Sequence, residues 1–434
     1  MIALLDPQKM LEAAAEEVRT AVTSARSAQI DWARQSTRAR AKLIGTLRPL
    51  LAEQATSMAR ITAALRDRPV AEKMTSEILP LLAAIRFLHT NAPRLLRTKR
   101  HARRGRPLWL GGHSFTVERK PFGVVLIVAP ANYPLFLPAV QMLHALVAGN
   151  AVLIKPAESA SPPIEHFVRQ IIARSRIPSQ LVQILPETPE AARQAVRYGI
   201  DKAIFTGSSE NGRDFLAELA KQNTPSVMEL SGADAVFVRA DADVELASKA
   251  IAFGLRLNAG DTCMAPASVI VHEAVAAELS NRLEALGLAT EGLFIVRDDA
   301  QALEVAALDD YGLGASIFSR DEAAAQSFAR RLNTGFVTIN DIIVPTADPR
   351  FPFGGTRGSG FGTTRGAEGL LEMTYPQAVA TRRGRFLPHL NPAKAGDEDL
   401  FGAFVAAAHG RGLGARFRAL RSLIRLSRNR GARS

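Results

Sequence analysis

Short apolar runs alternate with longer amphipathic stretches from residue 120 onward. The runs lie at residues 124–128, 151–154, 181–185, 203–205 and 226–230. Most of the stretches between them are long enough for a helix and carry apolar residues at helical spacing. This alternation predicts βαβ units and a parallel sheet covered by helices on both faces. Such sheets bind ligands at the carboxyl ends of their strands, so functional side chains are expected directly after these runs.

Two further regions extend the pattern. Residues 9–90 are rich in Ala, Leu, Glu and Arg with amphipathic spacing, which predicts several helices and a turn at 66–69. After residue 230, apolar runs at 235–238, 268–271, 315–318 and 336–339 predict a second set of strands. The fold class expected is α/β, with a parallel-sheet domain followed by a second α/β domain.

The composition is that of a globular protein. The chain has 434 residues, of which 47% are hydrophobic and 22% charged, and its length predicts two or three domains. One cysteine excludes an internal disulfide framework and favours a reducing, cytoplasmic compartment. The most apolar stretch, 122–149, is interrupted by prolines and polar residues, so we expect no spanning helix, and the N-terminus does not resemble a signal peptide.

The net charge of +12 is concentrated in two segments. Residues 401–434 contain eight arginines and no acidic residue, and a second basic run lies at 94–106. A basic patch attracts anionic lipid, nucleic acid or acidic protein, although a solvated or disordered tail is an equal alternative. Leu413, Phe417, Leu420 and Ile424 recur at helical spacing among these arginines, a pattern typical of helices that lie on an anionic membrane. An arm that packs on a partner subunit is the other reading, and nucleic acid is not expected.

Polar side chains follow the first two strands. Asn132 comes after the first strand, where its amide could donate to a developing oxyanion or simply form a turn. Lys155 and Glu158 come after the second strand and could hold two ribose hydroxyls, or could form an ordinary surface pair.

The turn after the fourth strand contains two glycines. In the segment from Phe205 to Arg213, Gly207 and Gly212 would let backbone N–H groups approach a phosphate at a helix N-terminus. The segment lacks the common dinucleotide fingerprint, and Arg213 stands where a P-loop requires lysine, which excludes nucleotide hydrolysis. A tight turn without a ligand is the alternative.

Two residues have the chemistry of a base and a nucleophile. Glu229 lies within the fifth apolar run, where partial burial would raise the pKa of its carboxyl towards that of a general base; a solvated glutamate at the strand end is the alternative. Cys263 lies in a loop punctuated by Gly260 and Pro266, where a thiolate could attack a carbonyl carbon. Isolated cysteines are more often small core residues.

Taken in order, these segments resemble the aldehyde dehydrogenase superfamily over residues 25–385. The motifs that carry the resemblance are Pro-Phe-Gly-Val-Val at 121–125, Asn-Tyr-Pro at 132–134, Ala-Gly-Asn at 148–150, Lys-Pro-Ala-Glu at 155–158, Phe-Thr-Gly-Ser at 205–208, Glu-Leu-Ser-Gly at 229–232, Gly-Asp-Thr-Cys at 260–263, Tyr-Gly-Leu-Gly-Ala-Ser at 311–316, Ile-Asn at 339–340 and Pro-Phe-Gly-Gly at 352–355. Their ordered combination is more specific than any single fragment. The residues of these motifs are most similar to those of the branch that handles fatty and aromatic aldehydes. Members of that branch often end in a tail that binds membranes.

The resemblance implies a role for each matching residue. It makes Cys263 the nucleophile, Glu229 the general base and Asn132, with the backbone N–H of the cysteine, the oxyanion hole. It implies NAD or NADP as cofactor and no metal; the acidic Glu158, which would repel a 2′-phosphate, slightly favours NAD. The cofactor-binding residues expected are Val128, Pro130, Lys155, Glu158, Phe205, Thr206, Gly207, Ser208, Gly212, Leu230 and Phe353.

The sequence departs from the family pattern after the nucleophile. Cys263 and Tyr311 are only 48 positions apart, so a sizeable piece of the second domain is missing. That piece normally carries the glutamate that holds the nicotinamide ribose, and the segment 291–294 replaces it poorly. Smaller departures are Ala131, Ser231, Ala233 and Asp261, none of which removes a catalytic group.

These observations combine into one set of expectations. Residues 1–92 and 120–230 should form the dinucleotide-binding domain, 231–372 a shortened catalytic domain, 93–119 and 373–385 an oligomerisation element, and 386–434 a linker and basic tail. The function expected is NAD(P)-dependent oxidation of an aldehyde to a carboxylic acid by a homodimer, cytoplasmic or peripheral at the inner face of a membrane. The alternatives are acyl reduction in the reverse direction and a catalytically impaired relative that acts as a scaffold.

Overall fold

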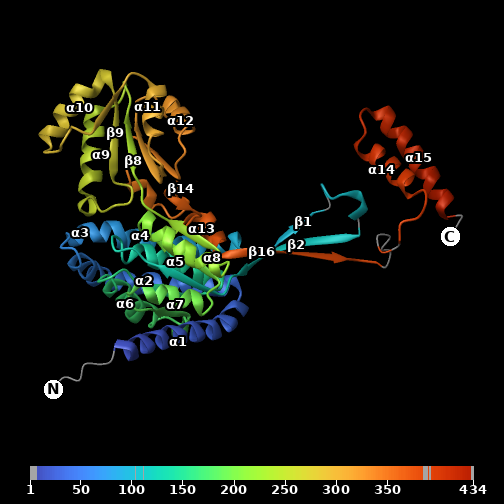
Figure 1. The fold of residues 1–434 in the computed structure, drawn as a ribbon, viewed down its shortest axis with the longest axis horizontal. Helices are drawn as coiled ribbons and strands as arrows, with labels where there is room; N and C mark the ends of the chain where they lie inside the picture. Colours follow the sequence, from blue (N-terminus) through green and yellow to red (C-terminus); the bar gives the residue numbers. More distant parts are fainter. Residues whose placement is uncertain (1–6, 103, 111, 385–389, 391, 432–434) are drawn as a thin grey trace. The chain divides into compact units, whose positions relative to one another are not determined.

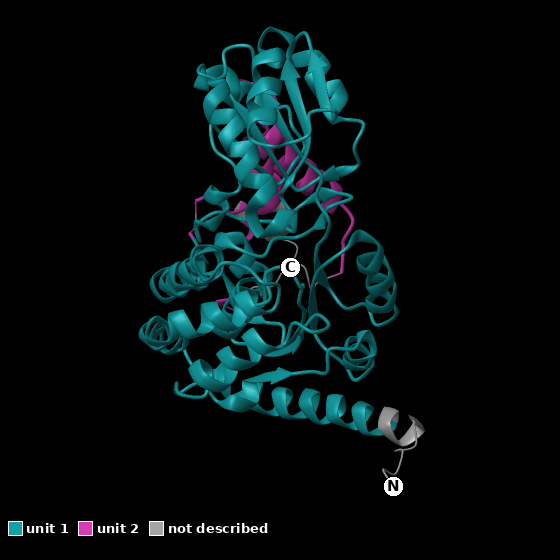
Figure 2. Ribbon diagram, turned by 90° about the vertical axis from the view of Figure 1, so that its left-hand side faces the viewer, with its two compact units in different colours: residues 1–101, 116–379 teal, residues 102–115, 380–434 magenta. Residues whose placement is uncertain are grey.

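The computed structural model describes residues 7–102, 104–110, 112–384, 390 and 392–431 (Figure 1). Contacts divide the chain into two compact units (Figure 2). Unit 1 comprises Met1–His101 and Thr116–Val379, and unit 2 comprises Ala102–Phe115 and Ala380–Ser434. The elements of both units are described separately below.

Unit 1 begins with the expected helices. They are α1(Pro7–Arg34), α2(Thr37–Ala64), α3(Val70–Lys73), the π-helix η1(Met74–Ile78) and α4(Leu79–Leu95). The predicted turn at 66–69 separates α2 from α3 because Asp67 adopts a left-handed conformation with φ 49° and Pro69 cannot continue the preceding helix. Ser36 caps α2 by accepting from the Ala39 N–H.

A six-stranded sheet follows, in the order β15-β7-β6-β3-β4-β5. Its strands are β3(Val124–Val128), β4(Ala151–Lys155), β5(Val182–Ile184), β6(Lys202–Thr206), β7(Ser226–Glu229) and β15(Gly360–Phe361). All are parallel except β15, which pairs antiparallel to β7. The parallel arrangement and the five runs from which it was predicted are confirmed. Every residue of β3 and β4 is buried, as expected for strands covered on both faces.

Helices cover both faces of this sheet. On one side lies α5(Phe136–Ala148), backed by α2 and α4; on the other lie α1, α7(Pro189–Arg197) and α8(Ser209–Lys221) (Figure 1). A shorter helix, α6(Pro162–Phe167), runs into the π-helix η3(Val168–Ile172), and the 3-10 turn η4(Ser179–Leu181) leads into β5. The strand order reverses between β3 and β6, so a crevice opens at the carboxyl ends of these two strands.

The second α/β region has a five-stranded parallel sheet in the order β10-β9-β8-β12-β13. Its strands are β8(Asp234–Val238), β9(Pro266–His272), β10(Leu293–Val296), β12(Gly314–Phe318) and β13(Phe336–Ile339). One face packs on α9(Val244–Arg256) and α10(Glu273–Ala285), the other on α11(Asp299–Ala306) and α12(Glu322–Ala329). β10 was not predicted; two of its four apolar side chains, Phe294 and Ile295, are exposed at the sheet edge.

Short elements complete unit 1. They are the 3-10 turns η5(Leu257–Gly260) and η6(Val344–Ala347), the paired strands β11(Tyr311–Gly312) and β14(Thr356–Arg357), and α13(Gly366–Glu372). The ranges expected as an oligomerisation element contain β1(Lys99–His101), β2(His113–Pro121) and β16(Thr374–Arg382), which form a three-stranded sheet in the order β1-β2-β16.

Unit 2 contains the turn η2(Leu108–Leu110) and two helices, α14(Asp397–His409) and α15(Leu413–Gly431). The helices pack against each other, and Arg416 of α15 donates to the carbonyls of Ala407 and Ala408 at the end of α14. The helical spacing seen at Leu413 to Ile424 is thus confirmed. Residue 385 of the expected oligomerisation element and residues 386–389 and 391 of the expected linker lie outside the described residues, and α14 begins inside the linker range, at Asp397. No helix in the described parts of the chain is long and apolar enough to cross a bilayer.

Candidate active site

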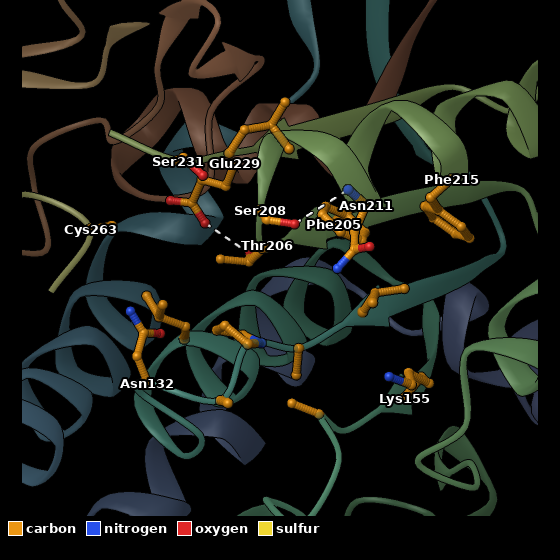
Figure 3. Close-up of a pocket in the computed structure, with 18 of the residues that line it drawn as sticks. Asn132, Lys155, Phe205, Thr206, Ser208, Asn211, Phe215, Glu229, Ser231 and Cys263 are labelled. Atoms are coloured by element: carbon orange, nitrogen blue, oxygen red, sulfur yellow. Dashed lines mark hydrogen bonds between the residues drawn. The ribbon is translucent and has the colours of Figure 1, made fainter. Parts of the chain in front are cut away.

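A cavity of about 650 Å³ lies at the carboxyl ends of β3, β4, β6 and β7 and against the loop that precedes β9 (Figure 3). It is the crevice expected where the strand order reverses. Thirteen of the fourteen site residues predicted from the sequence line it: Val128, Pro130, Asn132, Lys155, Glu158, Phe205, Thr206, Gly207, Ser208, Glu229, Leu230, Cys263 and Phe353.

Cys263 reaches the cavity because the chain before it turns sharply. Asn258, Ala259 and Gly260 are consecutive left-handed residues with φ of 52°, 55° and 81°. Glycine adopts this conformation freely, whereas alanine does so at a cost of about 1 kcal/mol and must be held there. The turn brings Cys263 out of the core, where isolated cysteines usually lie, and leaves it partly exposed in the cavity.

The structure explains why the Glu-Leu-Ser-Gly motif ends in a glycine, Gly232. A Cβ at this position would lie 2.4 Å from the backbone oxygen of Cys263 and 2.9 Å from the Leu313 side chain. The segment that follows Glu229 can therefore pass behind Cys263 only without a side chain. This contact couples two motifs that are more than thirty positions apart.

The surroundings of Cys263 disfavour its thiolate form. Loss of water around the sulfur raises its pKa to about 12, and the carboxylates of Glu229 and Asp234 add to the rise. The Arg365 guanidinium and the backbone N–H of Cys263 itself act in the opposite direction. Attack by this sulfur therefore requires a nearby base to remove its proton.

Glu229 is the carboxylate available for that task. It ends β7, is 3% exposed, and accepts hydrogen bonds from the Thr364 hydroxyl at 2.9 Å, the Thr206 hydroxyl at 3.1 Å and the Gln141 amide at 3.2 Å. Burial raises the pKa of the Glu229 carboxyl, while Arg365 and these donors oppose the rise. A carboxylate whose pKa is raised by burial is a stronger base than an exposed one, which suits it to proton transfer. Figure 3 shows it between Thr206 and Cys263.

Asn132 is oriented by its neighbours. Its Nδ2 donates to the Asp261 carbonyl at 2.9 Å, and its Oδ1 accepts from the Tyr133 N–H at 2.9 Å. An amide nitrogen carries two hydrogens, so one N–H of Asn132 remains for an oxygen in the cavity. The Asp261 carbonyl belongs to the same loop as Cys263, which places both candidate oxyanion donors on one rim.

The other end of the cavity has the features of a nucleotide site. Lys155 is 8% exposed and the pKa of its ammonium is lowered by burial, against which Glu187 and Glu158 act. Ser208 caps α8 by accepting from the Asn211 N–H, so the positive end of a 13-residue helix faces the cavity. These are the groups that would hold a dinucleotide: a cation for its ribose hydroxyls and a helix N-terminus for its phosphates.

Gly212 is the one predicted site residue that does not line the cavity. A Cβ there would lie 2.3 Å from Cδ2 of Leu230, which does line it. Gly212 thus makes room for a cavity residue, and its direct contact with a cofactor stays a prediction.

Sequence reasoning missed several lining residues. They are Arg66, Ala129, Ala131, Leu137, Ala157, Glu187, Pro189, Ala192, Arg193, Asn211, Asp214, Phe215, Ser231, Gly232, Gly260, Asp261, Thr262 and Leu313. Those on α7 and α8 carry no local signal, because a helix that faces a ligand has the same amphipathic spacing as one that faces the core. Thr364, Arg365 and Gln141, which surround Glu229, were also missed.

The shortened segment leaves one expected group unreplaced. Glu291 lies exposed in the turn before β10 and does not line the cavity. Among the described lining residues the carboxylates are Glu158, Glu187, Asp214, Glu229 and Asp261. Asp261 forms an ion pair with Arg66 and Glu229 lies in its own hydrogen-bond cluster, so neither replaces the glutamate of the missing piece.

A dinucleotide crevice joined to a thiol, a buried carboxylate and an amide defines a class of oxidoreductase that works through a covalent thioester. The chain belongs to the aldehyde dehydrogenase family, whose model matches residues 8–287 and 293–379. The break between the matched segments, residues 288–292, falls between Cys263 and Tyr311. Oxidation of aldehydes with NAD or NADP is the activity of this family.

Individual relatives agree with the family assignment. The chain is 28% identical over 465 residues to the 4,4'-diapolycopene aldehyde oxidase of Methylomonas sp, covering 91% of this chain and 87% of that one. It is 26% identical over 409 residues to the 4,4'-diapolycopene-4,4'-dial dehydrogenase of Cytobacillus firmus, covering 78% and 89%. The crystal structure of an NAD-dependent aldehyde dehydrogenase from Sinorhizobium meliloti superposes with a TM-score of 0.81 at 22% identity, over 87% of this chain and 89% of that one. That likeness confirms the fold.

Proposed function

We propose that this enzyme oxidises its aldehyde through a covalent adduct on Cys263. The observation that carries the proposal is that Cys263, Glu229 and Asn132, from three distant segments, line one cavity with the N-terminal end of α8. The dinucleotide would be held by Lys155 and Glu158 at the ribose and by the turn at Gly207 and Ser208 at the pyrophosphate.

The residues divide the chemistry as follows. Glu229 accepts the thiol proton, and the thiolate attacks the aldehyde carbon to form a tetrahedral alkoxide. The free N–H of Asn132 and the backbone N–H of Cys263 donate to that oxygen. Bound NAD(P) supplies the hydride acceptor that no side chain can provide. Loss of hydride from the carbon leaves a thioester on Cys263, and Glu229 releases the first proton to solvent. Glu229 then deprotonates a water molecule that attacks the thioester. The carboxylic acid is released, and the departing thiolate takes the proton back from Glu229, which restores the thiol.

Glu229 also decides between the two directions of reaction. A base that activates water would hydrolyse the thioester, which acyl reduction must preserve. Its hydrogen bonds to Thr364, Thr206 and Gln141 hold it at the cavity, and they support oxidation rather than the reverse reaction.

The test is direct. The purified protein is incubated with aliphatic, aromatic and polyene aldehydes and NAD or NADP, and reduced cofactor is followed by absorbance. We expect turnover that Cys263→Ala abolishes, with Cys263→Ser as the size-matched control that retains only a poor nucleophile. Absence of turnover from folded protein would instead support a scaffold role, and turnover that survives Cys263→Ala would refute the assignment of the nucleophile.

We propose an apolar aldehyde as substrate, such as the polyene aldehydes after which the Methylomonas and Cytobacillus relatives are named. The apolar lining residues Leu137, Leu313 and Phe353 support this choice. A higher kcat/KM for short polar aldehydes than for long apolar ones would refute it. For the cofactor, NAD is slightly favoured, because Glu158 and Glu187 lie beside Lys155 and would repel a 2′-phosphate.

We propose that two copies pair through the sheet formed by β1, β2 and β16. β16 lies at the edge of that sheet, and Tyr375 and Val379 on it are 43% and 41% exposed. An exposed edge strand with apolar side chains favours pairing with another chain. Light scattering should give a dimer mass for the wild type and a monomer mass for Val379→Lys; a dimer in both would place the interface elsewhere.

We propose that α14 and α15 bind an anionic membrane surface, which would locate the enzyme at the inner face of a membrane. Phe401, Val405, Leu413, Phe417 and Ile424 are between 47% and 85% exposed on these helices. Residues 401–434 contain eight arginines and no acid, which complements an anionic surface.

Vesicle flotation separates this proposal from its alternatives. We expect the full chain to float with phosphatidylglycerol–phosphatidylcholine vesicles at low salt and not with phosphatidylcholine alone. The variant Phe417→Ser/Leu420→Ser should lose flotation, whereas the matched change Phe294→Ser/Ile295→Ser on β10 should not. Flotation that is the same for all three proteins would end the membrane proposal.

A further inference from the structure

A buried ion pair lies behind the two loops that carry the candidate oxyanion donors. Lys73, at the end of α3, is 1% exposed, and Glu77, one turn later in η1, is 0% exposed. Their charged atoms are 3.3 Å apart. A buried pair is costly to form, and removal of one partner leaves an uncompensated charge, so each member needs further hydrogen bonds.

Glu77 holds the first of the two loops. Its Oε2 accepts from the N–H groups of Leu135 and Phe136, at 3.0 and 3.1 Å, in the first turn of α5. These groups have no partner within the helix, and a carboxylate also complements the positive helix end. Only two residues separate this anchor from Asn132, so Glu77 restrains the segment that presents the oxyanion amide.

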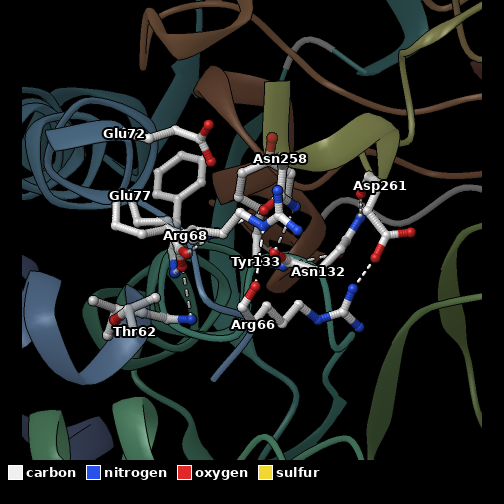
Figure 4. Close-up of polar contacts among 12 residues, drawn as sticks. Thr62, Arg66, Arg68, Glu72, Glu77, Asn132, Tyr133, Asn258 and Asp261 are labelled. Atoms are coloured by element: carbon white, nitrogen blue, oxygen red, sulfur yellow. Dashed lines mark hydrogen bonds and ion pairs between the residues drawn. The ribbon is translucent and has the colours of Figure 1, made fainter. Parts of the chain in front are cut away.

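Lys73 holds the second loop. Its Nζ donates to Oδ1 of Asn258 at 2.8 Å, and Nδ2 of Asn258 donates to the backbone oxygen of Asn132 at 3.0 Å. Asn258 is 2% exposed and has the first of the three left-handed conformations that turn the chain towards Cys263. Figure 4 shows Glu77, Asn258 and Asn132 in one polar cluster.

The loops are then joined to each other on the cavity side. The Tyr133 hydroxyl and Thr262 Oγ1 are 2.8 Å apart, and Asn132 Nδ2 donates to the Asp261 carbonyl. Lys73 Nζ lies 5.4 Å from the centroid of the Tyr133 ring, a cation–π distance. Three hydrogen bonds therefore join the two loops: Asn258 to Asn132, Tyr133 to Thr262 and Asn132 to Asp261. Lys73 contacts Asn258 and the Tyr133 ring directly, and Asn132 precedes Tyr133 in the chain.

From this geometry we infer that Lys73 is a positioning residue, which sets the Asn132 amide and the Cys263 backbone N–H at the separation that an oxyanion requires. It acts through Asn258 and touches neither substrate nor cofactor. The inference rests on the proposed function of Cys263 and Asn132.

Two reactions of the single thiol separate positioning from general damage. Acylation by p-nitrophenyl acetate forms a thioester, releases p-nitrophenolate and passes through an oxyanion, and it needs no dinucleotide. Alkylation by iodoacetamide displaces iodide and forms no oxyanion. Because the chain has one cysteine, the alkylation rate reports on Cys263, and the part of p-nitrophenolate release that Cys263→Ala abolishes reports on the same thiol. Loss of oxyanion geometry should lower the first rate and leave the second unchanged.

Lys73→Met should reduce the acylation rate about 100-fold, the effect of misplacing a catalytic group by about 1 Å. The alkylation rate should stay within a factor of about three, as expected for a change confined to the oxyanion donors. Lys249→Met, on an exposed lysine of α9, is the matched control and should change neither rate. Equal losses in both reactions, or no loss in either, would overturn the inference.

Two further variants keep the test informative if Lys73→Met does not fold. Lys73→Met/Glu77→Gln removes both charges, and the amide oxygen of the introduced glutamine can still accept from the α5 N–H groups. Asn258→Gly removes the link to Asn132 while tolerating φ of 52°. Each should show the same selective loss of acylation, and combining them should add little because they break one chain of contacts. A fully additive triple variant would show that Lys73 does not act through Asn258.

The proposed function fails separately from this inference. If wild-type protein neither reduces NAD(P) with any aldehyde nor releases p-nitrophenolate, the role of Cys263 is wrong, whatever Lys73 does. If the wild type is active and the acylation rate is insensitive to Lys73 and Asn258, only the positioning role is wrong.

Discussion

The buried Asp234 tests how far burial in the second α/β region raises the pKa of a carboxyl group. It begins β8, is 5% exposed, and its Oδ1 accepts from the Gly314 N–H at 3.0 Å. Burial raises the pKa of its carboxyl to about 7, and this single donor only partly opposes the rise. We therefore expect Asp234→Asn, which keeps the acceptor oxygen, to stabilise the protein at alkaline pH.

The magnitude follows from proton linkage. An unfolded aspartate has a pKa of about 3.9, so between that pH and about 7 the folded state holds a proton that the unfolded state has released. The stabilisation that this proton provides is complete below pH 4 and is lost as the pH rises through 7. With these two pKa values the loss is about 1.5 kcal/mol at pH 5 and about 4 kcal/mol at pH 8. Asparagine does not titrate, so the advantage of the variant should grow by about 2.5 kcal/mol between the two pH values.

The assay is urea unfolding of both proteins at pH 5 and pH 8, followed by far-ultraviolet circular dichroism. Fluorescence is less suitable because the two tryptophans, Trp32 and Trp109, lie outside the second sheet. A difference in free energy of unfolding that is the same at both pH values would refute a raised pKa for Asp234. Removal of the Asp234 carboxylate should also lower the pKa of Cys263, which the pH dependence of alkylation would report.

Three other substitutions test separate parts of the structure. Glu229→Gln keeps the oxygen that accepts from Thr364 but cannot take a proton. Stopped-flow should therefore show at most one equivalent of reduced cofactor and a steady-state rate reduced about 100-fold or more. An unchanged steady-state rate would exclude Glu229 as the base. Gly212→Ala puts a Cβ against Leu230 and should raise the KM for the dinucleotide about 10-fold, which corresponds to about 1.4 kcal/mol. Gly402→Ala is the control because the space around Gly402 is open, and it should leave this KM unchanged. Identical KM values for the two variants would contradict the prediction. Arg40→Met leaves the carbonyls of Val147 and Ala148 without their donor and should lower the free energy of unfolding by about 3 kcal/mol, which an unchanged urea midpoint would contradict.

The sequence predicted those parts of the site that follow strands. Asn132, Lys155, Gly207 and Glu229 each stand at or just after the end of an apolar run, and a parallel sheet brings all such ends to one edge. That inference needs only local periodicity and one topological rule. Cys263 follows no strand, and its place in a loop between Gly260 and Pro266 and among the ordered motifs pointed to it.

The surroundings of these groups could not be predicted in the same way. Thr364 donates to Glu229 across 135 positions, and Lys73 reaches Asn258 across 185. Such contacts depend on how the helices pack and on a π-helix and a left-handed turn, none of which produces a regular pattern of polar and apolar residues. The two-residue strand β15, which pairs with β7 beside Glu229, is likewise too short to have a period.

The shortened segment predicted after Cys263 would affect one half of the proposed site. Lys155 and the Ser208 end of α8, proposed to hold the adenosine and pyrophosphate, line the cavity, whereas Glu291, the nearest candidate for the nicotinamide contact, lies outside it. Contacts at the remote half of a ligand hold it in the site, but a misplacement of about 1 Å at its reactive end can still cost about 100-fold in rate. The deletion should therefore leave the dissociation constant of the dinucleotide close to that of an unshortened enzyme and act on the hydride step. Hydride transfer should then limit turnover, because the reactive ring is less well oriented. An aldehyde deuterated at the carbon that loses hydride should therefore give a lower kcat than the unlabelled aldehyde.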